Sequence, residues 1–226
     1  MELKVIGTGS SGNCYLLTNG QETLVIEAGL PFKAVKKVLN FNIRSIAGVI
    51  VSHVHGDHHA YSHEYRTAGI SVFEPYTMES LRQDATFGGF KVQSFDLVHN
   101  VPCCGFLISH KDFGKLLYVS DTEYLRYTFR NLNVMLIEMN YSDEYIDREA
   151  AKFRHVKTGH LEKQTTLDAI KANASDSLSH VILCHLSASG ADPDEFRAAA
   201  IEVVPIGCTV DIAVPDLTVD LSDTPF

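Results

Sequence analysis

The sequence predicts an α/β fold in one domain, built from two halves that each combine a sheet with helices. Apolar runs of strand length alternate with segments that carry a helical pattern, and turn residues or polar clusters separate them. A length of 226 residues suits one large layered domain. No low-complexity linker, short repeat or break in composition divides the chain. We therefore expect residues 1–226 to form a single domain.

The chain opens with strands around a glycine-rich loop. Residues 7–12 match G-x-G-x-x-G, the pattern of a dinucleotide-binding loop, which requires a helix after its last glycine. Here residues 13–18 have a strand pattern, and Asn19-Gly20 is a hairpin turn leading into a second strand at 22–26. A nucleotide cofactor is therefore not expected. Ser11 and Asn13 remain candidate contacts to a substrate.

Strands and helices alternate through the rest of the chain. Helical patterns are predicted from Pro31 to Leu39, after residue 59 as far as Thr67, around 78–81, and at 143–154, 163–172 and 194–203. Further strands are predicted at 46–51, 70–73, 90–95, 105–109, 116–119, 134–137, 181–184, 210–214 and 217–221.

Composition narrows the class of protein. Hydrophobic residues at 45% and charged residues at 21% describe an ordinary globular chain. No signal peptide or membrane-span pattern is present, so we expect a cytoplasmic protein without membrane association. Five cysteines at irregular spacing make a poor disulfide framework. A net charge of −9 argues against a protein that coats nucleic acid, but bound divalent ions would still permit a nuclease.

The segment His53–His59 predicts metal binding. It carries four histidines and one aspartate within seven residues, directly after the apolar run Ile46–Val51. If the strand stays extended, His53 and His55 point to the same side, and Gly56 then lets the backbone turn. Asp57 and His58 would approach a second cation. Imidazole and carboxylate ligands suit zinc, with manganese or iron as alternatives.

Three further metal-competent side chains follow predicted strands. His99, Asp121 and His185 each stand just beyond an apolar run. Strand ends are where an α/β fold gathers its functional site, so we expect these side chains to converge with the histidine cluster.

This ordered series resembles the metal motifs of the metallo-β-lactamase-fold hydrolases over essentially the full chain. The matching residues are His53-x-His55-x-Asp57-His58, then His99, Asp121 and His185. The resemblance implies a four-layer αββα sandwich with two divalent metal ions at one edge. It assigns His53, His55 and His99 to one ion, Asp57, His58 and His185 to the other, and Asp121 to both. A hydroxide between the ions would be the nucleophile, oriented by Asp57.

Shorter motifs resemble the YycJ (WalJ)-like exonuclease branch of that superfamily. They are Gly7–Cys14, Glu27–Leu30, Glu138-x-Asn140, Gly159–Leu161 and Cys184–Ser187. The branch usually has aspartate where this chain has Glu27, so the effect of Glu27 as an acceptor behind the metal ligands is left open. Gly159-His160 before a helix resembles the segment that supplies a catalytic histidine in RNase Z. The matching glutamate of RNase Z is replaced here by Tyr118.

We therefore expect a dinuclear metal-dependent hydrolase, most of all a phosphodiesterase or exonuclease-like nuclease that acts on DNA. Asp57 and His160 are the expected catalytic residues, and Ser11, Asn13 and His160 the expected substrate contacts. One alternative is a hydrolase of small lactones, esters or cyclic phosphodiesters with the same metals. A second is a metal-binding module without catalysis, which the full ligand set disfavours. The sequence leaves the oligomeric state, the metal and the direction of exonuclease cleavage open.

Overall fold

The computed structural model describes residues 1–146 and 157–222, in which strands form two sheets. The six-stranded sheet has the order β13 (Thr218–Asp220), β1 (Glu2–Gly7), β2 (Cys14–Thr18), β3 (Thr23–Ile26), β4 (Ile46–Ile50) and β5 (Val72–Phe73). The seven-stranded sheet has the order β12 (Thr209–Ile212), β11 (His180–Cys184), β10 (Val134–Glu138), β9 (Gly114–Val119), β8 (Cys104–His110), β7 (Phe90–Asp96) and β6 (Asp84–Phe87).

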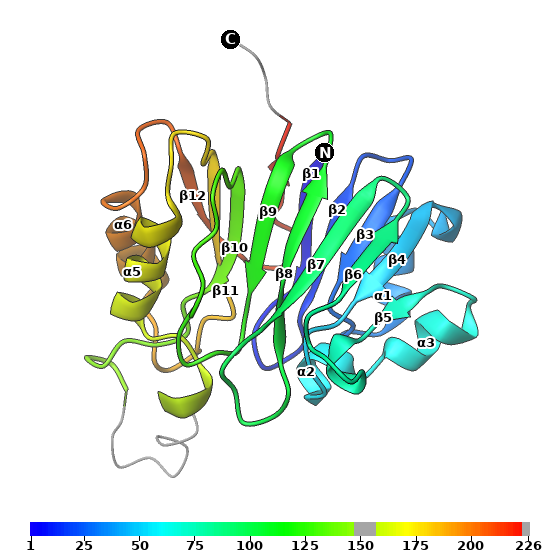
Figure 1. Cartoon of the computed structure of the whole chain (residues 1–226), viewed down its shortest axis with the longest axis horizontal. Helices are drawn as coiled ribbons and strands as arrows, with labels where there is room; N and C mark the ends of the chain where they lie inside the picture. The colour runs from blue at the N-terminus through cyan, green and yellow to red at the C-terminus, as the bar shows by residue number, and fades with distance from the viewer. Residues whose placement is uncertain (147–156, 223–226) are drawn as a thin grey trace.

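Helices cover the outer faces of both sheets. They are α1 (Phe32–Val38), α2 (Gly56–His59), α3 (Ser62–Thr67), α5 (Lys163–Asn173) and α6 (Pro193–Ile201), with short 3₁₀ turns at Ile43–Ser45 and Pro75–Thr77. Figure 1 shows α5 and α6 on one side of the paired sheets and α1 to α3 on the other. The predicted αββα sandwich is confirmed. Within the described part of the chain, no helix is long and apolar enough to span a membrane.

Three apolar clusters hold the four layers together. The largest lies between the two sheets and includes the fully buried Tyr15, Phe106 and Tyr118. A second packs the seven-stranded sheet against α5 and α6, for example through Ile170 and Phe196. The third packs the six-stranded sheet against α1 and α3. Because β10 and its neighbours β9 and β11 are parallel and covered on both faces, they read as continuous apolar runs in the sequence.

Two predicted elements differ from the structure, and a third lies mostly outside the described residues. The helix expected to continue to Thr67 is broken between α2 and α3, because the Tyr61 N–H donates to the Ala28 carbonyl at 2.9 Å rather than continuing the helix. The short helix expected around 78–81 is wrong; the Ser80 hydroxyl accepts from the Arg82 N–H at 3.1 Å, and a turn forms ahead of β6. Most of the helix expected at 143–154 lies outside the described residues.

Candidate metal centre

Both sheets deliver their polar residues to the same edge of the sandwich. The segment after β4 supplies four of them, His53, His55, Asp57 and His58. The seven-stranded sheet supplies three more: His99 beyond β7, Asp121 beyond β9 and His185 directly after β11. These side chains form groups whose ligand atoms all lie within 4.8 Å of one another. The predicted convergence of strand ends therefore occurs in the structure.

Close backbone contacts fix the start of α2. The Asn13 N–H donates to the Asp57 carbonyl at 2.7 Å, and the Ala28 N–H donates to the His58 carbonyl at 2.7 Å. A side chain at Gly29 would collide with this loop, since a Cβ atom there would stand 1.8 Å from the Asp57 oxygen. Gly56, by contrast, has an ordinary helical backbone with open space around it, so the sharp turn expected there does not depend on glycine.

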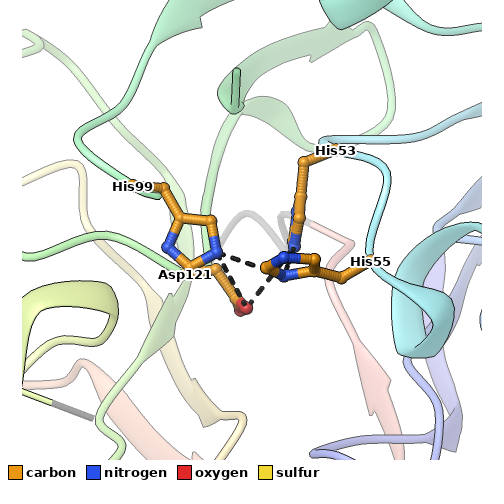
Figure 2. A group of neighbouring side chains, drawn as sticks. All are labelled: His53, His55, His99 and Asp121. Carbon is orange, nitrogen blue, oxygen red and sulfur yellow. Dashed lines mark hydrogen bonds and ion pairs between the residues drawn. The ribbon is translucent and has the colours of Figure 1, made fainter. Parts of the chain in front are cut away.

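The first group of donors comprises three imidazoles and one carboxylate. His53 Nε2 lies 3.1 Å from His55 Nδ1, which lies 3.3 Å from His99 Nε2. One oxygen of Asp121, Oδ2, lies 3.6 Å from His53 Nε2 and 4.0 Å from His99 Nε2. Figure 2 shows the three rings and the carboxylate turned toward one another. The first group is therefore His53, His55, His99 and Asp121.

The second group uses the other oxygen of the same aspartate. Asp121 Oδ1 lies 3.3 Å from His58 Nε2 and 3.7 Å from His185 Nε2. Asp57 Oδ2 completes the group at 3.5 Å from His58 Nε2 and 3.4 Å from His185 Nε2. Asp121 thus turns one oxygen to each group, which is the arrangement that a carboxylate bridging two ions requires.

These separations fit coordinated metal ions. Ligand bonds of about 2.0–2.1 Å in a tetrahedron place neighbouring donor atoms about 3.3 Å apart. Separations of 3.1–3.5 Å between neighbouring donor atoms lie close to that value in both groups. Imidazole nitrogens with shared carboxylates are a donor set that zinc, manganese and iron accept. The residues present therefore fit two divalent cations, whose identity the donor set leaves open.

Polar contacts behind three of the imidazoles, two of them hydrogen bonds, favour one nitrogen of each ring facing inward. The Nδ1 atoms of three rings contact groups outside the donor set: His53 contacts the Ser52 hydroxyl at 2.9 Å, His58 lies 3.3 Å from Glu27 Oε1, and His185 contacts Glu138 Oε1 at 3.0 Å. Such partners set the tautomer and orientation of a ligating histidine. Glu27 lies where a supporting acceptor was expected, fully buried at the end of β3.

Glu138 is the hub of this supporting layer, and sequence reasoning gave it no role. Its Oε1 atom accepts from Nδ1 of His160 at 2.7 Å and from Nδ1 of His185 at 3.0 Å. Its Oε2 atom accepts from the backbone N–H groups of Asp121 and Leu161, both at 3.0 Å. A fully buried glutamate at the end of the apolar strand β10 is the signal that could have marked it.

His160 stands at the edge of the donor groups. Its ring stacks on His185 with 5.3 Å between the ring centroids and lies 6.1 Å from the ring of His99. Burial opposes protonation of His160, but the Glu138 carboxylate raises its pKa above the ordinary value. The structure thus brings His160 next to the second group.

Burial and charge act differently on the two groups. Burial lowers the pKa of His99 to about 4 and holds the pKa of His53 well below its ordinary range, so both rings are neutral, the form that binds metals. Burial also disfavours a charged His185, yet Asp121 and the other carboxylates around it raise its pKa to about 10. The second group therefore attracts positive charge.

The two expected substrate contacts near the N-terminus have different surroundings. Ser11 is exposed in the loop after β1 and belongs to neither donor group. Asn13 is fully buried: its amide Oδ1 accepts from the Gly9 N–H at 2.8 Å, and its Nδ2 lies 3.0 Å from His58 Nε2. This burial favours a role for Asn13 in positioning α2 over direct contact with a substrate.

Comparisons with known proteins agree with this architecture. Residues 7–70 match the metallo-beta-lactamase superfamily. The chain is 24% identical over 219 residues to the exodeoxyribonuclease YycJ of Bacillus anthracis, covering 83% of each protein. It is 23% identical over 216 residues to the exodeoxyribonuclease WalJ of Streptococcus pneumoniae, covering 81% of this chain and 80% of that protein.

A solved structure shows the same fold. The metallo-beta-lactamase fold protein YhfI from Bacillus subtilis superposes with a TM-score of 0.74 at 19% identity. The match covers 96% of this chain and 97% of the other. The likeness extends over both sheets and both helical layers, so the fold is common to the two chains.

Proposed function

We propose that this chain is a metal-dependent hydrolase of the metallo-beta-lactamase superfamily, and specifically a dinuclear phosphodiesterase that cleaves DNA in the manner of an exonuclease. The observation that carries the proposal is the pair of four-donor groups joined by Asp121, with His160 beside them. The similarity to proteins named exodeoxyribonuclease supports DNA as the substrate.

The donor groups would hold two divalent cations, zinc or manganese. His53, His55 and His99 would hold one, Asp57, His58 and His185 the other, and Asp121 both. Cations bound there would supply Lewis acidity toward a phosphoryl oxygen and lower the pKa of water. The protein therefore does not need a nucleophilic side chain of its own.

The side chains around the donors would orient the substrate and move its protons. Asp57 would orient the attacking water through its carboxylate, as well as hold a cation. His160 directs its Nδ1–H at Glu138, so Nε2 is the atom that would contact the scissile phosphate or protonate the leaving oxygen. Glu138 would hold the rings of His160 and His185 in a fixed relative orientation, because its Oε1 atom accepts from the Nδ1 atoms of both rings.

The test begins with metal analysis of the purified protein, followed by assays of its zinc and manganese forms. The substrates are end-labelled DNA, a chromogenic phosphodiester and a panel of lactones. We expect about two ions per chain and DNA cleavage. Robust hydrolysis of lactones or small phosphodiesters without DNA cleavage would place the small-molecule alternative first. Absence of metal binding would remove the metalloenzyme proposal altogether.

One variant tests the role of His160. His160→Ala should lower phosphodiester turnover by about 10²-fold while leaving the metal content unchanged, because a proton donor is lost and no ligand is. His63→Ala, which removes an exposed histidine of α3, is the matched control. Unchanged DNA cleavage by His160→Ala would return His160 to a structural role.

A further inference from the structure

A strip of arginine and tyrosine side chains leads away from the candidate metal ligands across the seven-stranded sheet. Three of its members lie on the loop that begins after Asp121, and the fourth lies just before β6. The strip consists of Tyr124, Arg126, Tyr127 and Arg82. Because Tyr124 follows Asp121 by three positions, one end of the strip starts at the candidate metal centre.

Contacts around a single carboxylate, Asp96, link Arg126, Tyr127 and Arg82. Tyr124 and Arg126 lie two positions apart on this loop, and both side chains are exposed. Asp96 Oδ2 lies 3.5 Å from Arg126 Nη1 and accepts from the Tyr127 hydroxyl at 2.7 Å. Asp96 Oδ1 accepts from Arg82 Nε at 2.8 Å. Arg82 also stands over the Tyr127 ring, 5.4 Å from its centroid.

The strip ends in a hollow of about 630 Å³ on the outer face of β6 to β8. Arg82 and Gln93 form part of its polar wall, and Phe95, Leu107 and Phe129 form its apolar floor. The rings of Phe95 and Phe129 are 4.8 Å apart. The volume lies in the range of pockets that bind small organic groups. β7, which carries Gln93 and Phe95, runs on from this hollow toward His99, so hollow and donor groups lie at the same end of the sheet.

The exposed side chains of the strip suit a partner that carries phosphate groups and aromatic bases. The side chains of Arg82 and Arg126 are 64% and 53% exposed, and Tyr124 is 42% exposed. Arg82 and Arg126 share the Asp96 carboxylate, and Asp84 also lines the hollow, so what the strip offers a partner is exposed guanidinium groups and not a net positive charge. Planar guanidinium and phenol groups stack on bases, and guanidinium also pairs with phosphate.

We propose that this strip and its hollow bind the single-stranded polynucleotide segment that continues from the phosphodiester held at the metal ligands. The inference rests on the proposed nuclease function and gives it a substrate class, an unpaired strand rather than an intact duplex. A flipped-out base would stack between Arg82 and the aromatic floor, while Arg126 and Tyr124 would hold the backbone and base next to the scissile bond.

The test compares strand binding with hydrolysis of a small substrate. Binding of a labelled single strand of roughly ten nucleotides is measured by fluorescence anisotropy on the metal-loaded protein. The double variant Arg82→Ala, Arg126→Ala should bind the strand about tenfold or more weakly. The slope of log binding constant against log salt concentration should fall by an amount equivalent to up to about two phosphate contacts. Turnover of a chromogenic phosphodiester and metal content should not change. Arg44→Ala, an exposed arginine on the far layer, is the matched control.

Further variants and outcomes separate this inference from the proposed function. Arg126→Lys keeps the charge but loses the flat stacking surface, so it should recover the salt dependence but only part of the affinity. If the double variant binds the strand as tightly as wild type and DNA is still cleaved, the proposed strand-binding role of the strip is wrong and the proposed nuclease function stands. A wild type that binds the strand through the strip but never cleaves DNA would overturn the nuclease instead. Equal affinity of wild type for duplex and single strand would contradict the substrate class.

Discussion

Two pairs of histidine and glutamate lie at opposite ends of the strands, and they differ in how the imidazole is used. One pair lies where the chain turns between β2 and β3 and between β8 and β9, which we call the turn end. There, His110 Nε2 contacts Glu22 Oε1 at 3.0 Å, and His110 Nδ1 accepts from the Asp112 N–H. At the other end, His185 Nδ1 contacts Glu138 at 3.0 Å, and its Nε2 lies among two further carboxylates. A buried imidazole and a glutamate partner are therefore common to both pairs. Only the convergence of the second nitrogen with other donors marks a metal ligand.

The largest expected effect comes from the carboxylate that touches both donor groups. Asp121→Ala should lower turnover on the order of 10³-fold, more than any single histidine change, because two cations would lose their shared ligand and repel each other. Metal content should fall in both groups, whereas His99→Ala should weaken mainly one. The measurements are metal stoichiometry and phosphodiester turnover. Near wild-type turnover with two ions bound would show that the bridging assignment is wrong.

The two glutamates provide a matched pair of substitutions. Every partner of Glu138 is an N–H donor, so Glu138→Gln would place an amide NH₂ against donors and should cost about 10- to 100-fold in metal affinity or activity. Glu22→Gln makes the same chemical change at the turn end and should leave turnover unchanged. Metal titration and the melting temperature of both variants decide this. Equal losses of turnover would mean that the difference between the two pairs is structural only.

The smallest expected effect concerns acid stability at the turn end. A hydrogen bond from the Gly89 N–H, together with His110, lowers the pKa of Glu22 below its ordinary value of 4.5. A group with a lowered folded-state pKa stabilises the fold above pH 4.5, and this contribution is lost as the pH falls through the folded-state pKa. The Glu22→Gln variant should therefore have a lower melting temperature than wild type near neutral pH. Its free energy of unfolding should be lower by less than about 1 kcal/mol. The difference in stability between wild type and Glu22→Gln should disappear at acid pH. A difference that does not depend on pH would contradict this account.

Much of the fold and the donor set follows from local sequence patterns. His53 and His55 follow an apolar strand in close succession, and Asp121 and His185 end two others, so their convergence could be expected from strand-end geometry alone. The assignment of Asp121 to both donor groups came from the family resemblance. Sequence spacing alone does not predict which carboxylate oxygen faces which imidazole ring.

The features that sequence reasoning missed depend on contacts between distant segments. Glu138 acquires its role from four partners that lie 17 to 47 positions away along the chain. The break between α2 and α3 depends on the Ala28 carbonyl, which no helical pattern reveals. The strand β6 is short and becomes ordered only by pairing with β7 in a hairpin. Such outcomes are decided by tertiary structure, not by local propensity.

Because the donor groups take ligands from both sheets, cations bound there would also cross-link the two sheets of the sandwich. Separating the sheets would divide the ligands of each cation between two layers, so metal binding and cooperative unfolding would be linked by mass action. Free metal at about 100 times its dissociation constant would add about 2.7 kcal/mol to the free energy of unfolding for one such site. The edge of the sandwich that holds the candidate metal centre would then also set how the folded state responds to metal supply.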